Sequence, residues 1–172
     1  LEVYQKLASE FAAIEPPVWS SLIAKYLAVR GYNVKILDAE AEFLTHKETA
    51  DIIIKENPTL SVYMIYGQQP SASTQCMPAG RKTVKLVNEE TSCELKSIVI
   101  GTHASALPQR TLKDEPYTFV CQGEGPLTIE GLLKEIKKEK YNYKNVPGLW
   151  YMDEGQVKFN KSAAVSYTHL TL

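Results

Sequence analysis

Three short segments of this sequence combine glycine with small hydroxylated or polar residues, and each follows an apolar run. They are residues 67–74 (GQQPSAST), 101–106 (GTHASA) and 122–126 (QGEGP). Glycine lets a ligand approach the backbone closely, and a serine or threonine hydroxyl both donates and accepts hydrogen bonds. No two side chains offer a convincing nucleophile and base. The segments therefore predict a binding site for a large polar cofactor, with no catalytic residue.

The first segment offers short hydroxyls and exposed N–H groups beyond a predicted buried strand. Such groups can bond a polar cofactor without blocking its approach. Alternatively, Ser71 or Ser73 only caps the following helix, as serine often does. Local sequence leaves both interpretations open. The candidate contacts are Gly67, Gln68, Ser71, Ser73 and Thr74.

The second segment adds Gly101, Thr102 and His103 as candidate contacts. Gly101 permits close backbone approach, and Thr102 carries a hydroxyl. A lone histidine can ligate a metal, but we favour a structural imidazole that donates to a backbone carbonyl. No second His, Cys or carboxylate lies nearby at metal-ligand spacing. The sequence therefore predicts no metal site among these residues.

The third segment places Gly123, Glu124 and Gly125 ahead of a predicted helix. The unpaired N–H groups at a helix start favour a polar or anionic ligand group. Glu124 would oppose a phosphate there. Its alternative role is to complement the positive end of the helix dipole.

Alternating strands and helices are predicted to position these segments. The run 60–66 is typical of a strand that is buried on both faces of a parallel sheet. A capping box at Thr45 and Glu48 begins one helix. Strands are predicted at 32–38, 60–66, 96–100 and 117–121. Helices are predicted at 1–14, 19–31, 45–57 and 129–136. Two further helices are predicted, one that follows a polar loop ending at Ala79 and a short one that starts at Pro108.

These elements predict an α/β fold with a doubly wound parallel sheet, closed by a C-terminal β-hairpin. The hairpin strands are 149–152 and 156–159, joined by a three-residue turn at 153–155. Because a helix opens the chain, we expect the first strand of an ordinary doubly wound domain to be missing. Such sheets bind ligands beyond the carboxyl ends of their strands. The three segments should therefore meet at one edge.

Composition narrows the classes of partner. Lys plus Arg number 19 against 20 for Asp plus Glu, a net charge of -1, so no basic field exists to hold nucleic acid. The apolar runs are far shorter than the roughly 20 residues of a membrane span. Three cysteines are too few and too far apart for a disulfide framework. We expect a soluble domain in the reducing cytoplasm.

Taken in order, several longer stretches resemble the amino-terminal domain of cobalamin-dependent radical S-adenosylmethionine proteins, a group that includes enzymes similar to the anaerobic magnesium-protoporphyrin ester cyclase. The stretches are EPPVWSSLIAKYLAVRGYNVKILDAEAE, a helix ending ENP, GTHASALPQRTL, QGEGPLTIEGLL and VPGLWYMDEGQVKFN, within residues 15–160. The resemblance implies a flavodoxin-like (Rossmann-like) fold that holds cobalamin at the carboxyl edge of its sheet, lined by the three segments.

The resemblance also implies a radical S-adenosylmethionine barrel in the same parent chain, carrying a [4Fe-4S] cluster on a CxxxCxxC motif. The present sequence lacks that motif, so the chain alone is expected to bind rather than to catalyse. We expect residues 1–161 to form the cobalamin-binding domain, truncated at its N-terminus. Residues 162–172 are expected to be a non-native tail or the start of a linker.

Other functions remain open for this fold class. A phosphoacceptor receiver needs an Asp at the end of its central strand, where this chain has Tyr66 and Gly67. A flavin carrier needs a hydroxyl-rich phosphate loop, which is not seen before the first helices. A cofactor-free structural or interaction module is compatible with everything in the sequence.

Overall fold

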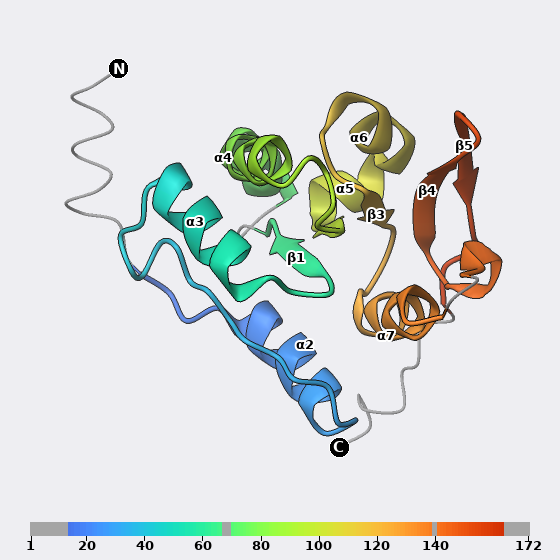
Figure 1. Cartoon of the computed structure of the whole chain (residues 1–172), viewed down its shortest axis with the longest axis horizontal. Coiled ribbons are helices and arrows are strands. Elements are labelled where there is room, and N and C mark those ends of the chain that lie inside the picture. The colour runs from blue at the N-terminus through green and yellow to red at the C-terminus, as the bar shows by residue number, and fades with distance from the viewer. Residues whose placement is uncertain (1–13, 67–69, 139–140, 164–172) are drawn as a thin grey trace.

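The computed structural model describes residues 14–66, 70–138 and 141–163, and these form one five-stranded sheet with helices on both faces (Figure 1). The strand order is β1-β2-β3-β4-β5. The first three strands are parallel, and β4 and β5 form an antiparallel hairpin that extends the sheet from β3. The predicted α/β class and the C-terminal hairpin are confirmed. The strands are β1 (Ser61–Met64), β2 (Ser97–Ile100), β3 (Phe119–Cys121), β4 (Leu149–Asp153) and β5 (Gln156–Phe159).

Alternating side chains of the central strand β2 build two cores. Ile98 and Ile100 pack on one face, which is covered by α2 (Val18–Ala28) and α7 (Pro126–Ile136). Val99 packs on the opposite face, as the period of two of a strand requires. The helices on that face are α4 (Pro70–Glu90), α5 (Thr102–Ala106) and α6 (Pro108–Asp114). The remaining elements are α3 (His46–Glu56), which packs on α4, and the short 3₁₀ helix η1 (Tyr143–Asn145).

Local signals at helix ends are confirmed where they depend only on neighbouring residues. The Thr45 hydroxyl accepts the Glu48 backbone N–H at 3.2 Å, and the Glu48 carboxylate accepts the Thr45 N–H at 2.8 Å. This is the predicted capping box of α3. The helix ends at Asn57 in the left-handed conformation, with φ of 44°.

The strand predicted at residues 32–38 is wrong. Residues 32–38 belong to no helix or strand, and β1 is an edge strand among the described residues. A strand exists only through its hydrogen-bonded neighbour, and the described part of the chain provides none here. Val34 and Ile36 are consequently exposed. The prediction that β1 is buried on both faces fails for the same reason, since its last three residues are only half-buried.

Two further boundaries differ from the predictions. The predicted polar loop up to Ala79 is mostly helix, because α4 begins at Pro70 and continues through Pro78. Burial of Met77 and Val84 against the sheet offsets the hydrogen bond that a proline cannot donate.

The hairpin turn has two residues rather than three. Glu154 and Gly155 both have positive φ, and Asp153 pairs with Gln156.

The helix predicted at residues 1–14 lies almost entirely outside the described residues. So do Gly67 and Gln68 of the first predicted segment.

A buried hydroxyl without a partner gives the first testable prediction. The Tyr117 hydroxyl is buried with no hydrogen bond, and it lies over Gly80, where an added Cβ would be 2.5 Å from it. An unpaired buried polar group costs about 1–3 kcal/mol. We therefore expect Tyr117→Phe to raise the free energy of unfolding by about 1 kcal/mol in urea at pH 7.

This gain should grow with pH above about 10, where tyrosine ordinarily ionises. Burial raises the pKa of Tyr117 in the folded chain, so as the pH rises this side chain ionises in the unfolded chain before it ionises in the folded one. This ionisation stabilises the unfolded state of the wild type, and Tyr117→Phe lacks that contribution. The exposed Tyr141 supplies the control Tyr141→Phe, expected to change stability little. A lower stability for Tyr117→Phe would contradict the prediction.

Candidate functional site

The carboxyl ends of β1, β2 and β3 meet at one edge of the sheet. The residues that follow these ends are Tyr66, Gly101 and Gln122, in parallel strands with matched register. The described parts of the three predicted segments therefore lie along the same edge. Their contacts with one another determine what each candidate residue is free to do.

Ser73 and Thr74 join the first segment to the second. The Ser73 hydroxyl is fully buried, donates to the Ile65 carbonyl at 2.6 Å and accepts the His103 backbone N–H at 3.1 Å. The Thr74 hydroxyl lies 2.9 Å from His103 Nδ1. His103 is thus held structurally, as favoured from the sequence, but its ring pairs with a hydroxyl and not with a backbone carbonyl. Ser71 lies exposed in the first turn of α4.

Gly101 allows β1 and β2 to approach each other at this edge. A Cβ on Gly101 would lie 2.0 Å from the Ile65 carbonyl oxygen, far inside van der Waals contact, and the residue is buried. Glycine is thus required here by the packing of the chain on itself. The following residue, Thr102, begins the short helix α5 and is half-buried.

Ser105 joins the second segment to the third. Its hydroxyl accepts the Gly123 backbone N–H at 2.9 Å. The neighbouring Gln122 is fixed from the other side, because its N–H donates to the Gly148 carbonyl at 2.8 Å and its side chain accepts the Trp150 indole N–H at 2.9 Å. Ser105 is absent from the predicted contacts. The only feature of the sequence that could have identified Ser105 is its place in a segment rich in hydroxyl groups.

The third segment keeps an open backbone beside these fixed points. Gly123 has φ of 109°, and the nearest atoms to a Cβ there belong to Ser162 at 3.9 Å. Gly125 precedes α7, whose start has no side-chain cap. A Cβ on Gly125 would lie 3.2 Å from the side chains of both Ile23 and Ile100, so this glycine serves packing. Glu124 is exposed between the two glycines.

An aromatic pair at the same edge is absent from the predicted contacts. The Trp19 ring stacks on the Tyr66 ring, with centroids 5.6 Å apart and 21° between the planes. Burial raises the pKa of the Tyr66 hydroxyl, and nearby Cys121 and Glu124 add to the rise. Tyr66 therefore lies beside the third segment. Trp19 lies in the first turn of α2, and 58% of the residue is exposed.

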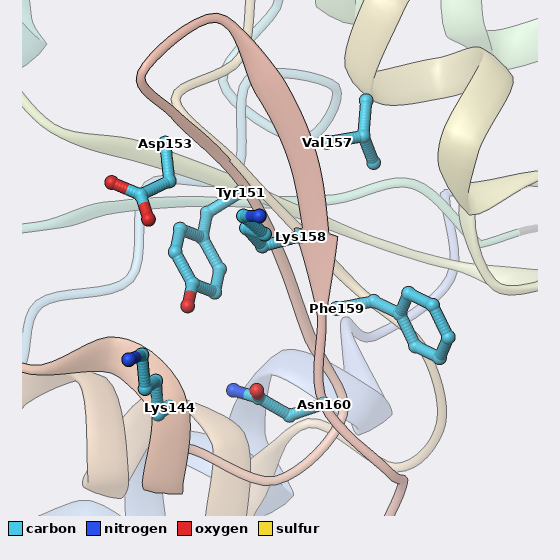
Figure 2. Close-up of a pocket in the computed structure, with 7 residues that line it drawn as sticks. All are labelled: Lys144, Tyr151, Asp153, Val157, Lys158, Phe159 and Asn160. Atoms are coloured by element: carbon cyan, nitrogen blue, oxygen red, sulfur yellow. The ribbon is translucent and has the colours of Figure 1, made fainter.

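Two shallow hollows flank the sheet. One, of about 580 Å³, lies next to the second and third segments and includes Leu107, Gln122 and Trp150. The other, of about 350 Å³, lies on the hairpin (Figure 2). There Tyr151 and Asp153 lie on one side of the strands, and the Asn160 amide already donates to two backbone carbonyls. The first hollow adjoins the predicted site, whereas the second does not.

Within residues 14–66, 70–138 and 141–163, no group of three or more His, Cys, Asp and Glu side chains lies together as a metal site would require. No helix in this part of the chain has the length and apolar character needed to span a membrane.

Comparison with known proteins relates this chain to a known family. The model of the "B12 binding domain" family matches residues 4–133. An uncharacterized methyltransferase of Pyrococcus horikoshii, PH0819, is 29% identical over 147 residues, which are 83% of this chain and 29% of that protein.

Solved structures of the cobalamin-dependent S-adenosylmethionine radical enzyme OxsB share the fold. The form with aqua-cobalamin bound has a TM-score of 0.69 at 21% identity, over 93% of this chain and 22% of that chain. The form with aqua-cobalamin and S-adenosylmethionine has a TM-score of 0.70 at 21% identity, over 92% and 21%. The chain therefore spans less than a third of each of these proteins.

Proposed function

The chain belongs to the B12-binding domain family, whose model covers residues 4–133, and we propose that it holds cobalamin at the edge formed by the ends of β1, β2 and β3. The single observation that carries this placement is Gly123, where a Cβ would meet only Ser162, at 3.9 Å, beside the uncapped start of α7. Parallel α/β sheets bind ligands at this edge. Cobalamin supplies a cobalt centre for one-carbon or radical chemistry, and the protein supplies binding and orientation.

The groups at this edge suit the rim of a corrin ring, which carries neutral amide side chains. Amides both donate and accept, so they match the backbone N–H groups near α7, the carboxylate of Glu124 and the hydroxyls of the first two segments. The exposed Glu124 disfavours a phosphate beside α7. We therefore assign the ring amides, rather than the phosphate of the nucleotide tail, to the third segment.

The predicted contacts divide into two groups under this proposal. Ser73, Gly101 and Gly125 shape the edge from within, since each is buried and in contact with the chain itself. On this proposal the outer group faces the cofactor. Its described members are Ser71, Thr74, Thr102, His103, Gly123 and Glu124, with Ser105 as an ordering residue. Gly67 and Gln68 remain proposed contacts that lie outside the described residues.

We propose further that this chain is the cobalamin-binding part of a longer radical S-adenosylmethionine protein. The chain matches about a fifth of OxsB and 29% of the Pyrococcus methyltransferase, and it has no CxxxCxxC motif. The [4Fe-4S] cluster and S-adenosylmethionine would be held by the barrel of the parent chain. On this proposal residues 1–161 are the domain without its first strand, and 162–172 are a tail or linker. Free thiols at Cys76, Cys93 and Cys121 fit a reducing cytoplasm.

A cofactor-free packing module is the second candidate, and one observation favours it. The hydroxyls of Ser73, Thr74 and Ser105 already have partners within the chain. Such a module would keep the same edge ordered for contact with a barrel and would bind no corrinoid.

Titration of the chain with hydroxocobalamin separates the two candidates. We expect a shift of the visible spectrum, co-elution on gel filtration and a dissociation constant below about 10 µM. Gly123→Ala should weaken binding about tenfold or more, because its methyl group occupies the open backbone. Gly155→Ala is the matched control, since Gly155 also has positive φ and open surroundings but lies on the hairpin turn. A chain that is folded by circular dichroism yet elutes free of cobalamin would establish the packing module instead.

A further inference from the structure

Trp19 lies on the sheet-facing side of α2, one turn beyond the buried part of that helix. Ile23 and Leu27 follow it at intervals of four residues, which places all three on one helical face. Ile23 and Leu27 are buried against the sheet. Trp19 points the same way, but at its level the strands have already ended, and its ring meets Tyr66 in place of a core.

The stack on Tyr66 fixes the position of the indole at the cofactor edge. Tyr66 comes two residues after β1 and packs against the core cluster that includes Ile23 of α2 and Cys121 of β3. The pair therefore lies between the start of α2 and the end of β3. Trp19 is nevertheless 58% exposed, and its helical neighbours Val18 and Leu22 are each 57% exposed. Exposed apolar residues that lie together in this way mark a binding surface more often than a single exposed ring does.

We infer that Trp19, supported by Tyr66, is a contact surface for the corrin ring itself. This inference rests on the proposed function and adds residues that neither the three segments nor the family match assigns. The corrin ring is roughly flat, with cobalt and four nitrogens at its centre, apolar ring carbons and methyl groups around them, and polar amide side chains at its rim. An indole face packs on its apolar methyl and ring atoms, while Gly123 and Glu124 remain at the polar rim. Tyr66 acts as a positioning residue, because its ring sets the tilt of the indole.

The nucleotide tail is the competing occupant, since its benzimidazole is also a flat aromatic group. Cobinamide, which has the corrin ring but no nucleotide tail, separates the two. If Trp19 contacts the ring, its removal weakens binding of cobalamin and of cobinamide by the same factor. If Trp19 contacts the tail, only cobalamin binding is weakened.

The test measures dissociation constants of hydroxocobalamin and of dicyanocobinamide by equilibrium dialysis. We expect Trp19→Ala to raise both constants about tenfold, and Trp19→Phe to restore most of the affinity. Tyr66→Leu should raise both constants by a smaller factor. Phe159→Ala is the matched control, because Phe159 is also an exposed ring, 63% accessible and stacked on Trp150 at 4.6 Å, but lies on the hairpin.

Each outcome decides a separate point. Loss of affinity for cobalamin alone, or no loss in Trp19→Ala, overturns the inference while the proposed function stands. If the wild-type chain binds neither corrinoid, the proposed function itself has failed. Circular dichroism of each variant shows that any loss of affinity occurs in a folded chain.

Discussion

Replacing Gly101 with alanine is expected to destabilise the chain by about 3 kcal/mol. The new methyl group would lie 2.0 Å from the Ile65 carbonyl oxygen, which belongs to the backbone and cannot rotate away as a side chain can. The ends of β1 and β2 would have to separate, although Ile65 donates its N–H to the Ile100 carbonyl at 2.7 Å. Urea unfolding monitored by circular dichroism measures the loss.

Gly31→Ala is the control for this substitution. Gly31 has φ of 84° after α2, and nothing lies within 4 Å of a Cβ there. Its replacement should cost only the strain of a left-handed residue, about 1 kcal/mol. If Gly101→Ala and Gly31→Ala lower the free energy of unfolding equally, the close approach of β1 and β2 is not the reason that Gly101 is needed.

Removing the Ser73 hydroxyl is expected to cost about 2 kcal/mol. Ser73→Ala leaves the Ile65 carbonyl and the His103 N–H without their shared partner in a fully buried position. Because this hydroxyl joins β1 to the start of α5, cobalamin binding should weaken as well. Thermal unfolding and the hydroxocobalamin titration measure the two effects.

Ser71→Ala provides the comparison within the same helical turn. Ser71 is exposed, so its removal should leave the stability nearly unchanged. If Ser73→Ala is as stable as Ser71→Ala, the hydrogen bonds of Ser73 are not needed to hold the edge together.

The glycines at this edge have different structural roles, although the sequence alone does not distinguish them. Gly101 and Gly148 leave room for a neighbouring carbonyl, since a Cβ would lie 2.0 Å and 2.5 Å from one, respectively. At Gly123 a Cβ would meet only Ser162, at an unstrained 3.9 Å. Under the proposed function, substitutions at the first two should act mainly through stability, whereas those at Gly123 should act mainly through affinity.

Features that depend on near neighbours can be predicted from the amino-acid sequence. The capping box at Thr45 needs only residues three apart, and the alternation of Ile98, Val99 and Ile100 needs only the pleat of one strand. Strands alternating with helices predict parallel pairing, and parallel pairing brings strand ends to one edge. The α/β class, the C-terminal hairpin and the edge that carries the candidate site followed from these rules.

Contacts between residues far apart in the chain depend on how the elements pack, and the sequence pattern does not contain them. Whether residues 32–38 form a strand depends on a hydrogen-bonding neighbour, and whether α4 passes through Pro78 depends on the sheet beneath it. The bond between Ser105 and Gly123 and the stack of Trp19 on Tyr66 join residues 18 and 47 positions apart. Periodicity records which side of an element is apolar, but not where the neighbouring element ends. It therefore places Trp19 on the same helical face as Ile23 but cannot show that Trp19 is exposed and Ile23 buried.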